Sequence, residues 1–317
     1  MDDYSKNNQL QTRKINEDSF IFELNAPNGN GKVYAHKIFN GMHIMGINIE
    51  SEIWPYMKMK FPRKVLNIHY CIDGRCEVVL DTSKSLCLSK NQICLCEYIA
   101  IKDFFYPTKY YKGVQIYIDL AEFEETSNFL IKEFNLDIKK IADDYSSNEE
   151  TLISMISTEL KIELEKIFKL ANNQDIFAMK MSVLNMFKML SLKNSPLENI
   201  KSNYLTSYQL KIAKLTKEIL TENLQYKIKI ADIASKFKVS PTTIKNYFKA
   251  LYGESISEYM RKIRMKEASI LIKTTNKPIS VISNEVGYEN QSKFASVYKS
   301  VYDISPIEDR RLTNIKS

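Results

Sequence analysis

The chain has 317 residues, with 45 Lys or Arg against 38 Asp or Glu and a formal net charge of +7, and it has room for two or three domains. No apolar run approaches the ~18–20 residues that span a bilayer, and Met1–Ser5 lacks the basic and apolar regions of a signal peptide, so we expect a cytoplasmic protein and no membrane partner. The five cysteines are then reduced, and their odd number argues against a complete disulfide framework.

Between about residues 20 and 120 the sequence is rich in short candidate β-strands. They are Ile21–Leu24, Lys32–Ile38, Met42–Ile49, Val65–Ile72, Arg75–Asp81, Ser85–Leu88, Gln92–Tyr98 and Val114–Asp119. Asp73-Gly74 is a strong signal for the turn of a β-hairpin between two of these strands. Many short strands with regular turns predict a β-barrel or a jelly roll.

Helical periodicity begins near Ala121 and returns at Thr151–Leu170 and Asp175–Leu192. The last segment is rich in Met and is apolar over most of its circumference. We therefore expect it to be buried on more than one side, in the core or at a subunit interface. The polar stretch from Lys193 to Asn203 is typical of a linker.

Two C-terminal segments, Ile230–Gly253 and Ile279–Asp303, repeat one apolar pattern with an offset of 49 residues before a central turn and 50 after it. A short helix, a tight turn and a second helix, present twice, predict two helix-turn-helix units. We expect a positive φ at Gly287 in the second turn, and Lys238 holds the matching place in the first.

The second helix of each unit separates an apolar face from a polar face. Ser240-Pro241 predicts a helix start, because Ser caps free N–H groups and Pro fits the first turn. Asn and Gln can pair bidentately with adenine, and Lys can contact guanine or phosphate. The candidate DNA-binding residues are Thr242, Thr243, Lys245, Asn246, Lys249, Asn290, Gln291, Ser292, Lys293, Ser296 and Lys299. The alternative is a pair of ordinary amphipathic helices with solvated polar faces.

The same stretch resembles the AraC/XylS family of transcription regulators over about a hundred residues. The resemblance is carried by Ile233-Ala234, Val239-Ser240-Pro241, Tyr247-Phe248-Lys249, Tyr252-Gly253, Arg264-Met265, Ala268, Leu271-Ile272, the run from Val286 to Phe294, Tyr298-Lys299 and Ser305-Pro306. Within the family, Gly287–Asn290 followed by Ser292–Phe294 is similar to the branch that includes regulators of siderophore uptake. Three residues depart from the family pattern: Asp303 replaces the usual Gly, Asp309 the usual Tyr, and Ser296 a frequent Arg. We expect the first two to loosen the last turn and the C-terminal helix, and the third to remove a DNA contact.

The resemblance implies a dimeric regulator whose recognition helices enter the major groove of double-stranded DNA. A linker helix over about Ile256–Ile272 would join the two units; at ~1.5 Å per residue it spans roughly 25 Å, which is compatible with major grooves about 34 Å apart. The implied partners are a promoter or operator, a small-molecule effector, a second copy of the chain and RNA polymerase.

The resemblance also implies an α+β fold class. An N-terminal cupin-like β-barrel with dimerisation helices would precede a C-terminal all-α domain with two helix-turn-helix units. We place a ligand-sensing β domain at 1–120, a helical dimerisation region at 121–195, a linker at 196–205 and the DNA-binding domain at 206–317.

The charge distribution agrees with this division. Tyr204–Ser317 contains 20 Lys or Arg and 11 Asp or Glu, a net of +9, whereas the preceding residues contain 25 and 27, a net of −2. A basic domain is favoured near phosphates because it releases condensed counterions. The positive excess therefore lies in the part expected to bind DNA.

The N-terminal half contains reactive residue types without a catalytic motif. His69 and Cys71 alternate on one strand face, as do Cys94 and Cys96; such a cluster binds a soft metal, or the Cys side chains are simply packed. The aromatic runs near Phe104 and Tyr110 would stack on a ligand or fill the barrel. We assign no enzymatic activity, no metal and no cofactor.

Two alternatives to a ligand-responsive regulator stay open. One is a regulator that ignores ligands. The other is a DNA-binding module fused to a cysteine-based methyl acceptor for DNA repair, although none of the five Cys lies in a Pro-Cys-His-Arg context.

Overall fold

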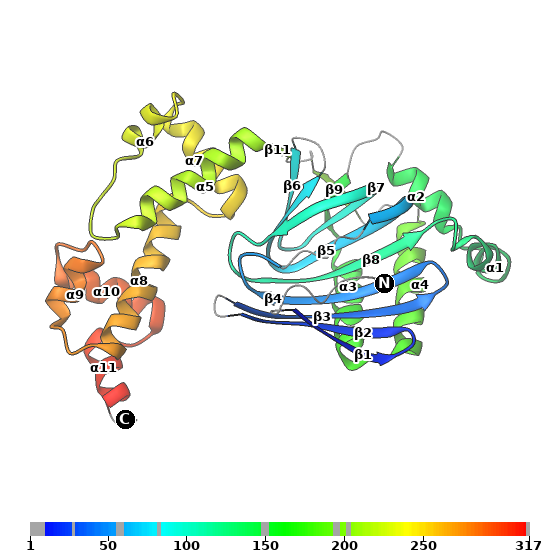
Figure 1. Cartoon of the computed structure of the whole chain (residues 1–317), viewed down its shortest axis with the longest axis horizontal. Coiled ribbons are helices and arrows are strands. Elements are labelled where there is room, and N and C mark those ends of the chain that lie inside the picture. Colours follow the sequence, from blue (N-terminus) through cyan, green and yellow to red (C-terminus); the bar gives the residue numbers. More distant parts are fainter. Residues whose placement is uncertain are drawn as a thin grey trace. The chain divides into compact units, whose positions relative to one another are not determined.

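A computed structural model of the protein describes residues 10–26, 29–54, 60–80, 84–146, 152–192, 197–200 and 204–314. The chain divides into two compact units, residues 1–206 and 207–317. The N-terminal unit combines strands with helices, and the described part of the C-terminal unit is helical throughout (Figure 1).

Short runs of β-branched and aromatic residues form the strands of the N-terminal unit. The strands are β1 Leu10–Asn16, β2 Ser19–Ala26, β3 Gly29–Phe39, β4 Met42–Glu50, β5 Lys60–Leu80, β6 Lys84–Ser89, β7 Gln92–Phe105, β8 Tyr111–Asp119, β9 Leu152–Ile156, β10 Leu197–Ile200 and β11 Tyr204–Thr206. Each strand predicted from the sequence overlaps one of these, and two of them merge into the single long strand β5.

The sheet is open. Its order is β1-β2-β3-β4-β8-β5-β7-β9-β10, with β6 beside β5 and β11 beside β6. Among the described residues β1 pairs only with β2 and β10 only with β9, so the sheet keeps two edges. A barrel requires its first and last strands to pair. The closed cupin-like barrel predicted from the sequence is therefore not confirmed.

The hairpin predicted at Asp73-Gly74 is wrong. Both residues lie inside β5, where Asp73 pairs with Lys112 and Gly74 with Tyr111 on β8. A type I′ hairpin turn needs a positive φ at both central residues, but of these two only Gly74 has one, at 81°. A side chain at Gly74 would collide with the Tyr110 carbonyl oxygen, so the glycine allows a close approach of two strands.

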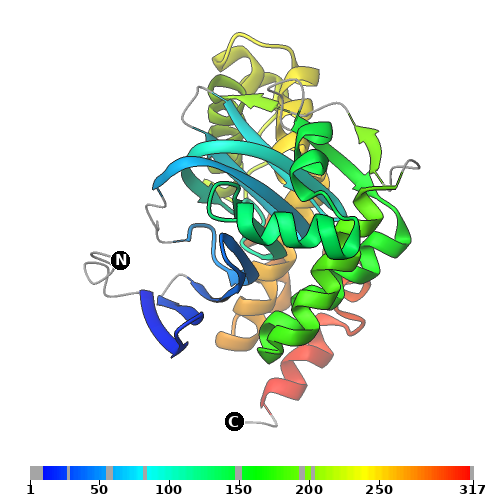
Figure 2. The same cartoon turned by 90° about the vertical axis from the view of Figure 1, so that its right-hand side faces the viewer.

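The described helices of the N-terminal unit are α1 Glu124–Phe134, α2 Ile138–Ser146, α3 Thr158–Asn173 and α4 Ile176–Leu190. α3 and α4 pack side by side, and both contact β3 (Figure 2). Strand residues such as Ile44 and Ile116 share a core with Leu164 of α3. Neighbouring residues on the same strands, among them Met45 and Tyr117, belong to a second core. The alternation of side chains thus gives the sheet two buried faces.

Strands β10 and β11 occupy part of the stretch predicted as a linker. Leu197–Ile200 pairs with β9, and Tyr204–Thr206 pairs with β6. Residues 193–196 and 201–203 lie outside the described residues. The described part of this stretch adds two strands to the N-terminal unit before the first C-terminal helix begins.

The C-terminal unit contains α5 Ser207–Glu222, α6 Ile230–Lys236, α7 Pro241–Tyr252, α8 Ile256–Thr274, α9 Ile279–Glu285, α10 Gln291–Tyr302 and α11 Pro306–Asn314. The pairs α6–α7 and α9–α10 are the two predicted helix-turn-helix units. Between them, α8 is the predicted linker helix, and it contacts α5, α7, α9, α10 and α11. Within the described ranges, no helix has the length and apolarity needed to cross a membrane.

Candidate nucleic-acid interface

Helix α7 begins where the sequence predicts. The Ser240 side chain accepts a hydrogen bond of 3.0 Å from the Thr243 backbone N–H, and Pro241 occupies the first turn. Ile244 and Phe248 are fully buried on the inner side of the helix. This burial fixes the rotation of α7 and leaves its opposite face in solvent.

The exposed face of α7 carries four of the five predicted DNA-binding residues, Thr242, Lys245, Asn246 and Lys249. Their spacing of i, i+3, i+4 and i+7 places them in one stripe along the helix. Thr243 differs, because it is half-buried and its hydroxyl lies 2.8 Å from the Ser240 Oγ. Its side chain therefore supports the helix start rather than the exposed stripe.

Helix α10 repeats this arrangement with different residues. Asn290 is the N-cap, and its Oδ1 accepts a 2.8 Å hydrogen bond from the Lys293 backbone N–H. Phe294 and Tyr298 are fully buried. The exposed predicted residues of this helix are Gln291, Ser292, Lys293, Ser296 and Lys299.

The cap gives Asn290 a structural function that the sequence did not reveal. Bidentate pairing with adenine uses both the amide oxygen and the amide nitrogen. Since the Asn290 oxygen already caps α10, base pairing through both atoms would cost the helix its N-cap. Gln291, which has no such hydrogen bond to the helix start, is the better candidate for reading a base.

The turns of the two helix-turn-helix units contain an equivalent backbone hydrogen bond. Val239 N–H donates to the Ala234 carbonyl at 3.0 Å, and Tyr288 N–H donates to the Ser283 carbonyl at 2.8 Å, which is the same bond 49 residues later. The positive φ predicted at Gly287 is confirmed at 81°, and the matching Lys238 has φ 54°. The repeat in sequence is thus a repeat in backbone geometry.

Comparison with known proteins gives a family match on this part of the chain. The helix-turn-helix domain family matches residues 233–312. The HTH-type transcriptional regulator YisR of Bacillus subtilis is 29% identical over 97 residues, which is 31% of this chain and 34% of that protein. The arabinose operon regulatory protein of Escherichia coli is 31% identical over 81 residues, which is 26% of this chain and 28% of that protein. A solved AraC-type transcriptional regulator from Chromobacterium violaceum is 28% identical, with coverage of 33% of this chain and 91% of that chain and a TM-score of 0.29. The C-terminal unit contains a helix-turn-helix domain of the AraC type.

YisR and the arabinose operon protein each match less than a third of this chain. The chain spans about a third of YisR and a little over a quarter of the arabinose operon protein. Both relatives are named as regulators, neither as an enzyme and neither for siderophore uptake.

Within the AraC-type domain, Asp309 does not loosen the C-terminal helix as predicted. Only 6% of Asp309 is exposed. Its Oδ2 accepts a 2.5 Å hydrogen bond from the buried Tyr298 hydroxyl and lies 3.4 Å from the Lys273 Nζ. The carboxylate therefore ties α11 to both α10 and α8. The other departure, Asp303, ends α10 in the left-handed region with φ 61°.

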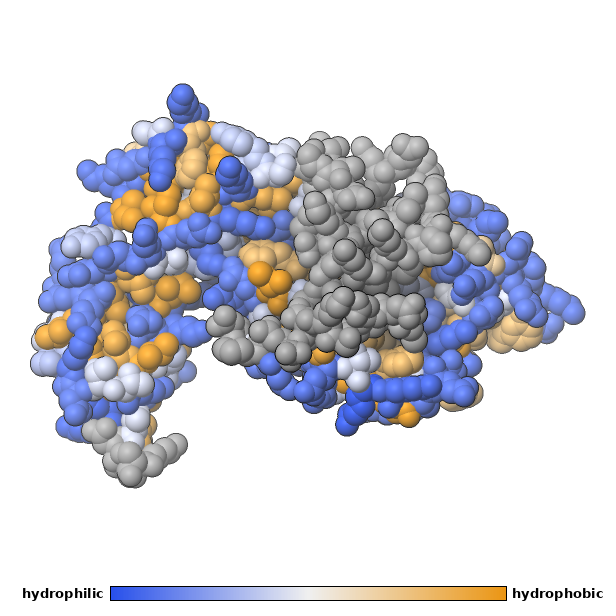
Figure 3. Space-filling view, viewed as in Figure 1, coloured by the Kyte–Doolittle hydropathy of each residue, from blue (hydrophilic) through white to orange (hydrophobic). Residues whose placement is uncertain are grey.

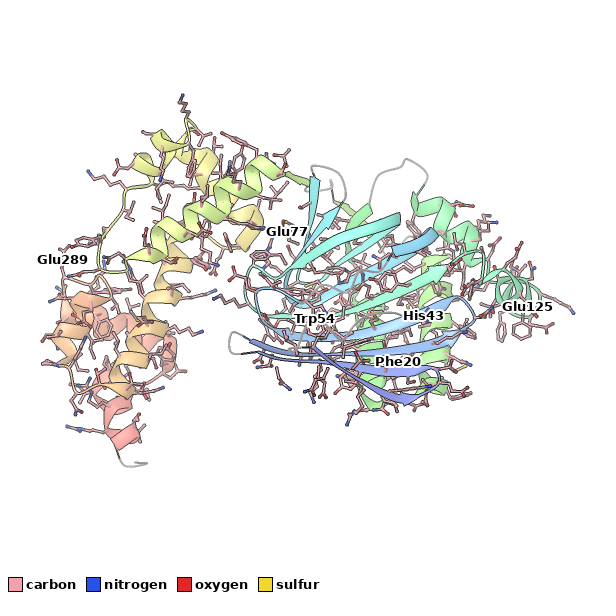
Figure 4. The ribbon with its side chains drawn as sticks, in the orientation of Figure 1. Phe20, His43, Trp54, Glu77, Glu125 and Glu289 are labelled. Carbon is pink, nitrogen blue, oxygen red and sulfur yellow. The ribbon has the colours of Figure 1, made fainter. Side chains whose placement is uncertain are left out.

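A contact that sequence reasoning missed joins the two halves of the AraC-type domain. A Cβ at Gly287 would collide with the Leu224 carbonyl oxygen and would lie 3.0 Å from the Arg264 guanidinium carbon. On the outside, Lys227 Nζ lies 3.6 Å from Glu289, which Figure 4 labels at the edge of this unit. The segment before α6, helix α8 and the second turn therefore meet at one place.

His69 and the five Cys residues of the N-terminal unit are packed, whereas His43 is exposed. His69 is buried, its Nε2 lies 2.6 Å from the Tyr111 hydroxyl, and burial lowers its pKa to about 3. All five cysteines are buried, and none of them forms a disulfide in the part of the chain that the structure describes. Within the described ranges, no three His, Cys, Asp or Glu side chains come together as metal ligands. Tyr106 and Tyr111 stack at 5.1 Å and are buried, so these aromatic residues fill the core.

Proposed function

We propose that the chain is a dimeric, sequence-specific DNA-binding transcription regulator of the AraC type whose N-terminal unit responds to a small molecule. The observation that carries the DNA-binding part is the pair of exposed polar faces on α7 and α10, each held by a capped helix start and a buried apolar face. Two such faces in one AraC-type domain are the expected arrangement for reading two segments of a DNA duplex.

The exposed side chains divide into two kinds of contact. Asn246 and Gln291 carry both a donor and an acceptor and are our candidates for reading base edges. Lys249 and Lys299 lie in the last turns of α7 and α10, and we assign them to phosphates. The remaining candidates are Thr242, Lys245, Ser292, Lys293 and Ser296, with Asn290 and Thr243 supporting the helix starts.

The surface chemistry of the C-terminal unit supports contact with an acidic polymer. Residues 204–317 carry the whole positive excess of the chain. Figure 3 shows hydrophilic side chains over much of this unit, with apolar patches between them. Neutralising phosphates with these cations releases counterions and makes binding dependent on salt.

Dimerisation is supported by apolar side chains on the outer side of α3 and α4. The inner side of α4 is core, with Met179 and Met186 fully buried, whereas Phe177 is 76% exposed and Met181 50% exposed. Ile162 on the neighbouring α3 is 61% exposed. A second copy of the chain would cover this surface, and sedimentation of Phe177→Glu/Met181→Glu would then show monomer. Lys132→Glu, which changes an exposed cation on α1, is the matched control and should stay dimeric.

Regulation by an effector and by RNA polymerase belongs to the same proposal. This part of the proposal is supported by the separate N-terminal unit, which precedes the AraC-type domain in the sequence. The sequence motifs Gly287–Asn290 and Ser292–Phe294 are similar to those of siderophore-uptake regulators. Genes of iron acquisition are therefore the first class of target genes to examine. An effector acts by having unequal affinity for two arrangements of the chain.

The deciding experiment is recovery of bound fragments from the source genome at physiological salt. A few enriched sites that share a repeat are the expected result, and the neighbouring genes would identify the pathway. Uniform, salt-sensitive recovery would contradict sequence-specific reading, because phosphate contacts alone bind all sequences alike. Repeating the recovery with candidate small molecules separates a ligand-responsive regulator from one that ignores ligands.

The cysteine-based repair function is disfavoured by burial. A methyl acceptor must present a reactive thiolate, and reactive cysteines are partly exposed with a lowered pKa. Burial raises the pKa of Cys71 and Cys76, and contact with Cys96 together with burial raises that of Cys94. Absence of methyl transfer from alkylated DNA to the protein would remove this alternative.

A further inference from the structure

The C-terminal unit contains a pocket of about 360 Å³ beside the contact between Arg264 and the second turn. Its walls come from the segment before α6, from the first half of α8 and from Tyr288. The residues that determine its chemistry are Tyr226, Lys227, Ile228, Arg261, Arg264 and Tyr288. All of them lie in one compact unit, so the pocket does not depend on the N-terminal unit.

The pocket wall contains a guanidinium with a buried nitrogen that has no hydrogen-bond partner among the described residues. The Nε of Arg264 is buried, and the part of the chain that the structure describes provides no hydrogen-bond partner for it. Burial lowers the pKa of Arg264, while the nearby Tyr288 opposes this. Buried cations in proteins are normally paired, because an unsatisfied charged donor is costly. Arg264 also lines the pocket, so an acceptor bound there would pair with the part of the guanidinium that faces the pocket.

The surrounding charges are also positive. Lys227 and Arg261 line the same pocket. Lys227 Nζ lies 3.6 Å from Glu289, but that carboxylate is 91% exposed and the pair is largely solvated. An exposed pair of this kind contributes little and is readily exchanged for another partner.

The rest of the lining is apolar or aromatic. Ile228, Ile256 and Met260 contribute aliphatic surface, and Tyr226 and Tyr288 contribute rings. Apolar walls with a few convergent polar groups are typical of small-molecule sites. A phosphate of duplex DNA would use only the cations, whereas a discrete organic anion would use the cations and the walls.

We propose that this pocket binds a small carboxylate with an aromatic or aliphatic body, with the carboxylate on Arg264 and Arg261 and the body between Tyr226, Ile228 and Tyr288. Arg is suited to this task because its planar guanidinium can hold a carboxylate through two parallel hydrogen bonds.

Because of its position, the pocket would allow a bound ligand to change DNA affinity. This step rests on the proposed function. Residues 226–230 lead into α6 of the first helix-turn-helix unit, and Tyr288 precedes α10 of the second. A ligand that contacts both sides would favour one spacing of α7 and α10. DNA affinity would change only to the extent that the two spacings bind ligand unequally.

The test uses the full chain without DNA and 1-naphthoate as the probe. Titration calorimetry should show saturable binding, at least tenfold weaker for the uncharged 1-naphthalenemethanol. Arg264→Met and Arg261→Met should each weaken naphthoate binding at least tenfold, and Arg264→Lys should restore part of it. Lys266→Met, an exposed cation elsewhere on α8, is the matched control and should bind like the parent.

Three outcomes would overturn the proposal. The first is absence of binding, and the second is equal binding by the parent and by Arg261→Met, which removes an exposed side chain and should leave the fold intact. The third is competition by inorganic phosphate as strong as that by naphthoate, which would make the cations a phosphate contact. Because these measurements contain no DNA, failure of operator binding would contradict the proposed function and leave the pocket result unchanged.

Discussion

The two helix-turn-helix units are copies of one backbone built with different side chains. In the first, Phe248, Tyr252 and Tyr259 form a cluster of rings, with Phe248 and Tyr259 centroids 5.3 Å apart. Fifty residues later the same three positions are Tyr298, Tyr302 and Asp309, and a 2.5 Å hydrogen bond joins the first to the last. An aromatic contact in one unit is thus a buried polar pair in the other. The comparison teaches that the geometry is retained while the interaction that holds it is exchanged.

The copies also agree at positions outside the helix-turn-helix segments. Ser255 and Glu258 cap the start of α8, with Ser255 N–H donating to the Glu258 carboxylate at 2.9 Å. Ser305 and Glu308 cap α11 in the same way at 2.8 Å. The repeated unit is therefore three helices long, and α11 corresponds to the start of α8.

The largest expected effect separates the two turns. Gly287→Ala places a Cβ against the Leu224 carbonyl oxygen in a backbone with φ 81°. The left-handed backbone costs about 1–2 kcal/mol and the overpacking about 1–3 kcal/mol, so we expect a loss of about 2–5 kcal/mol. Hydrogen exchange should show lost protection in α9 and α10. Lys238→Ala at the matching position keeps a non-glycine residue and should change little; equal effects of both variants would contradict the difference between the turns.

The next effect breaks the polar pair. Asp309→Ala leaves the buried Tyr298 hydroxyl without its acceptor, which costs about 1–3 kcal/mol. Urea unfolding measures the loss. The double variant Tyr298→Phe/Asp309→Tyr copies the first unit and should recover much of it; a double variant less stable than Asp309→Ala would show that the two copies are not interchangeable here.

A comparable effect on DNA binding would show whether both units read bases. Asn246→Ala and Gln291→Ala should each weaken binding to a recovered site by about 1–3 kcal/mol if both helices contact bases. Fluorescence anisotropy at fixed salt measures both. A loss confined to one variant would assign base reading to one helix, and parent affinity in both would refute the assignment of these faces.

A smaller gain in stability is expected from placing glycine where a non-glycine residue has a left-handed backbone conformation. Lys238 has φ 54° and Asp303 has φ 61°. The left-handed backbone costs about 1–2 kcal/mol, and the extra freedom of an unfolded glycine offsets about 0.5–1 kcal/mol of the gain. Lys238→Gly and Asp303→Gly should each stabilise the domain by roughly 0.5–1 kcal/mol. Thermal unfolding tests this, and a lower melting temperature would show that the original side chain makes a stabilising contact.

The smallest effect concerns pH. Hydrogen bonds from the Ser side chain and backbone lower the pKa of Glu258 and Glu308 below the usual 4.5. A lowered pKa means that the cap stabilises the fold above about pH 4.5 and that this contribution is lost as the pH falls. Carboxylate chemical shifts should give depressed midpoints for both residues. A normal midpoint in only one would show that its cap is not formed.

The sequence was sufficient where the spacing of residues determines the backbone. The 49-residue offset, the Ser240-Pro241 helix start and the positive φ of Gly287 were all predictable, because each depends on local chemistry. The prediction of a hairpin turn at Asp73-Gly74 was wrong because both residues pair with β8. This pairing is a tertiary contact that the local sequence does not determine. Closure of the sheet into a barrel, which is not confirmed, likewise depends on tertiary strand pairing.

The candidate DNA-binding face was predictable as a face but not residue by residue. Periodicity separates exposed from buried positions on α7 and α10. It does not show that Asn290 caps its helix or that Thr243 contacts Ser240. Nor does it show that Arg264 lies against the second turn, because nothing in its spacing relates it to Gly287.

Helix α8 has 19 residues, about 28 Å at 1.5 Å per residue, and it belongs to both copies, as the last helix of the first and the supporting helix of the second. Adding or removing one residue in its middle would move the second unit by only about 1.5 Å but would turn it by about 100° around the helix axis. A change in the length of α8 thus alters the relative rotation of the exposed faces of α7 and α10 far more than the distance between them.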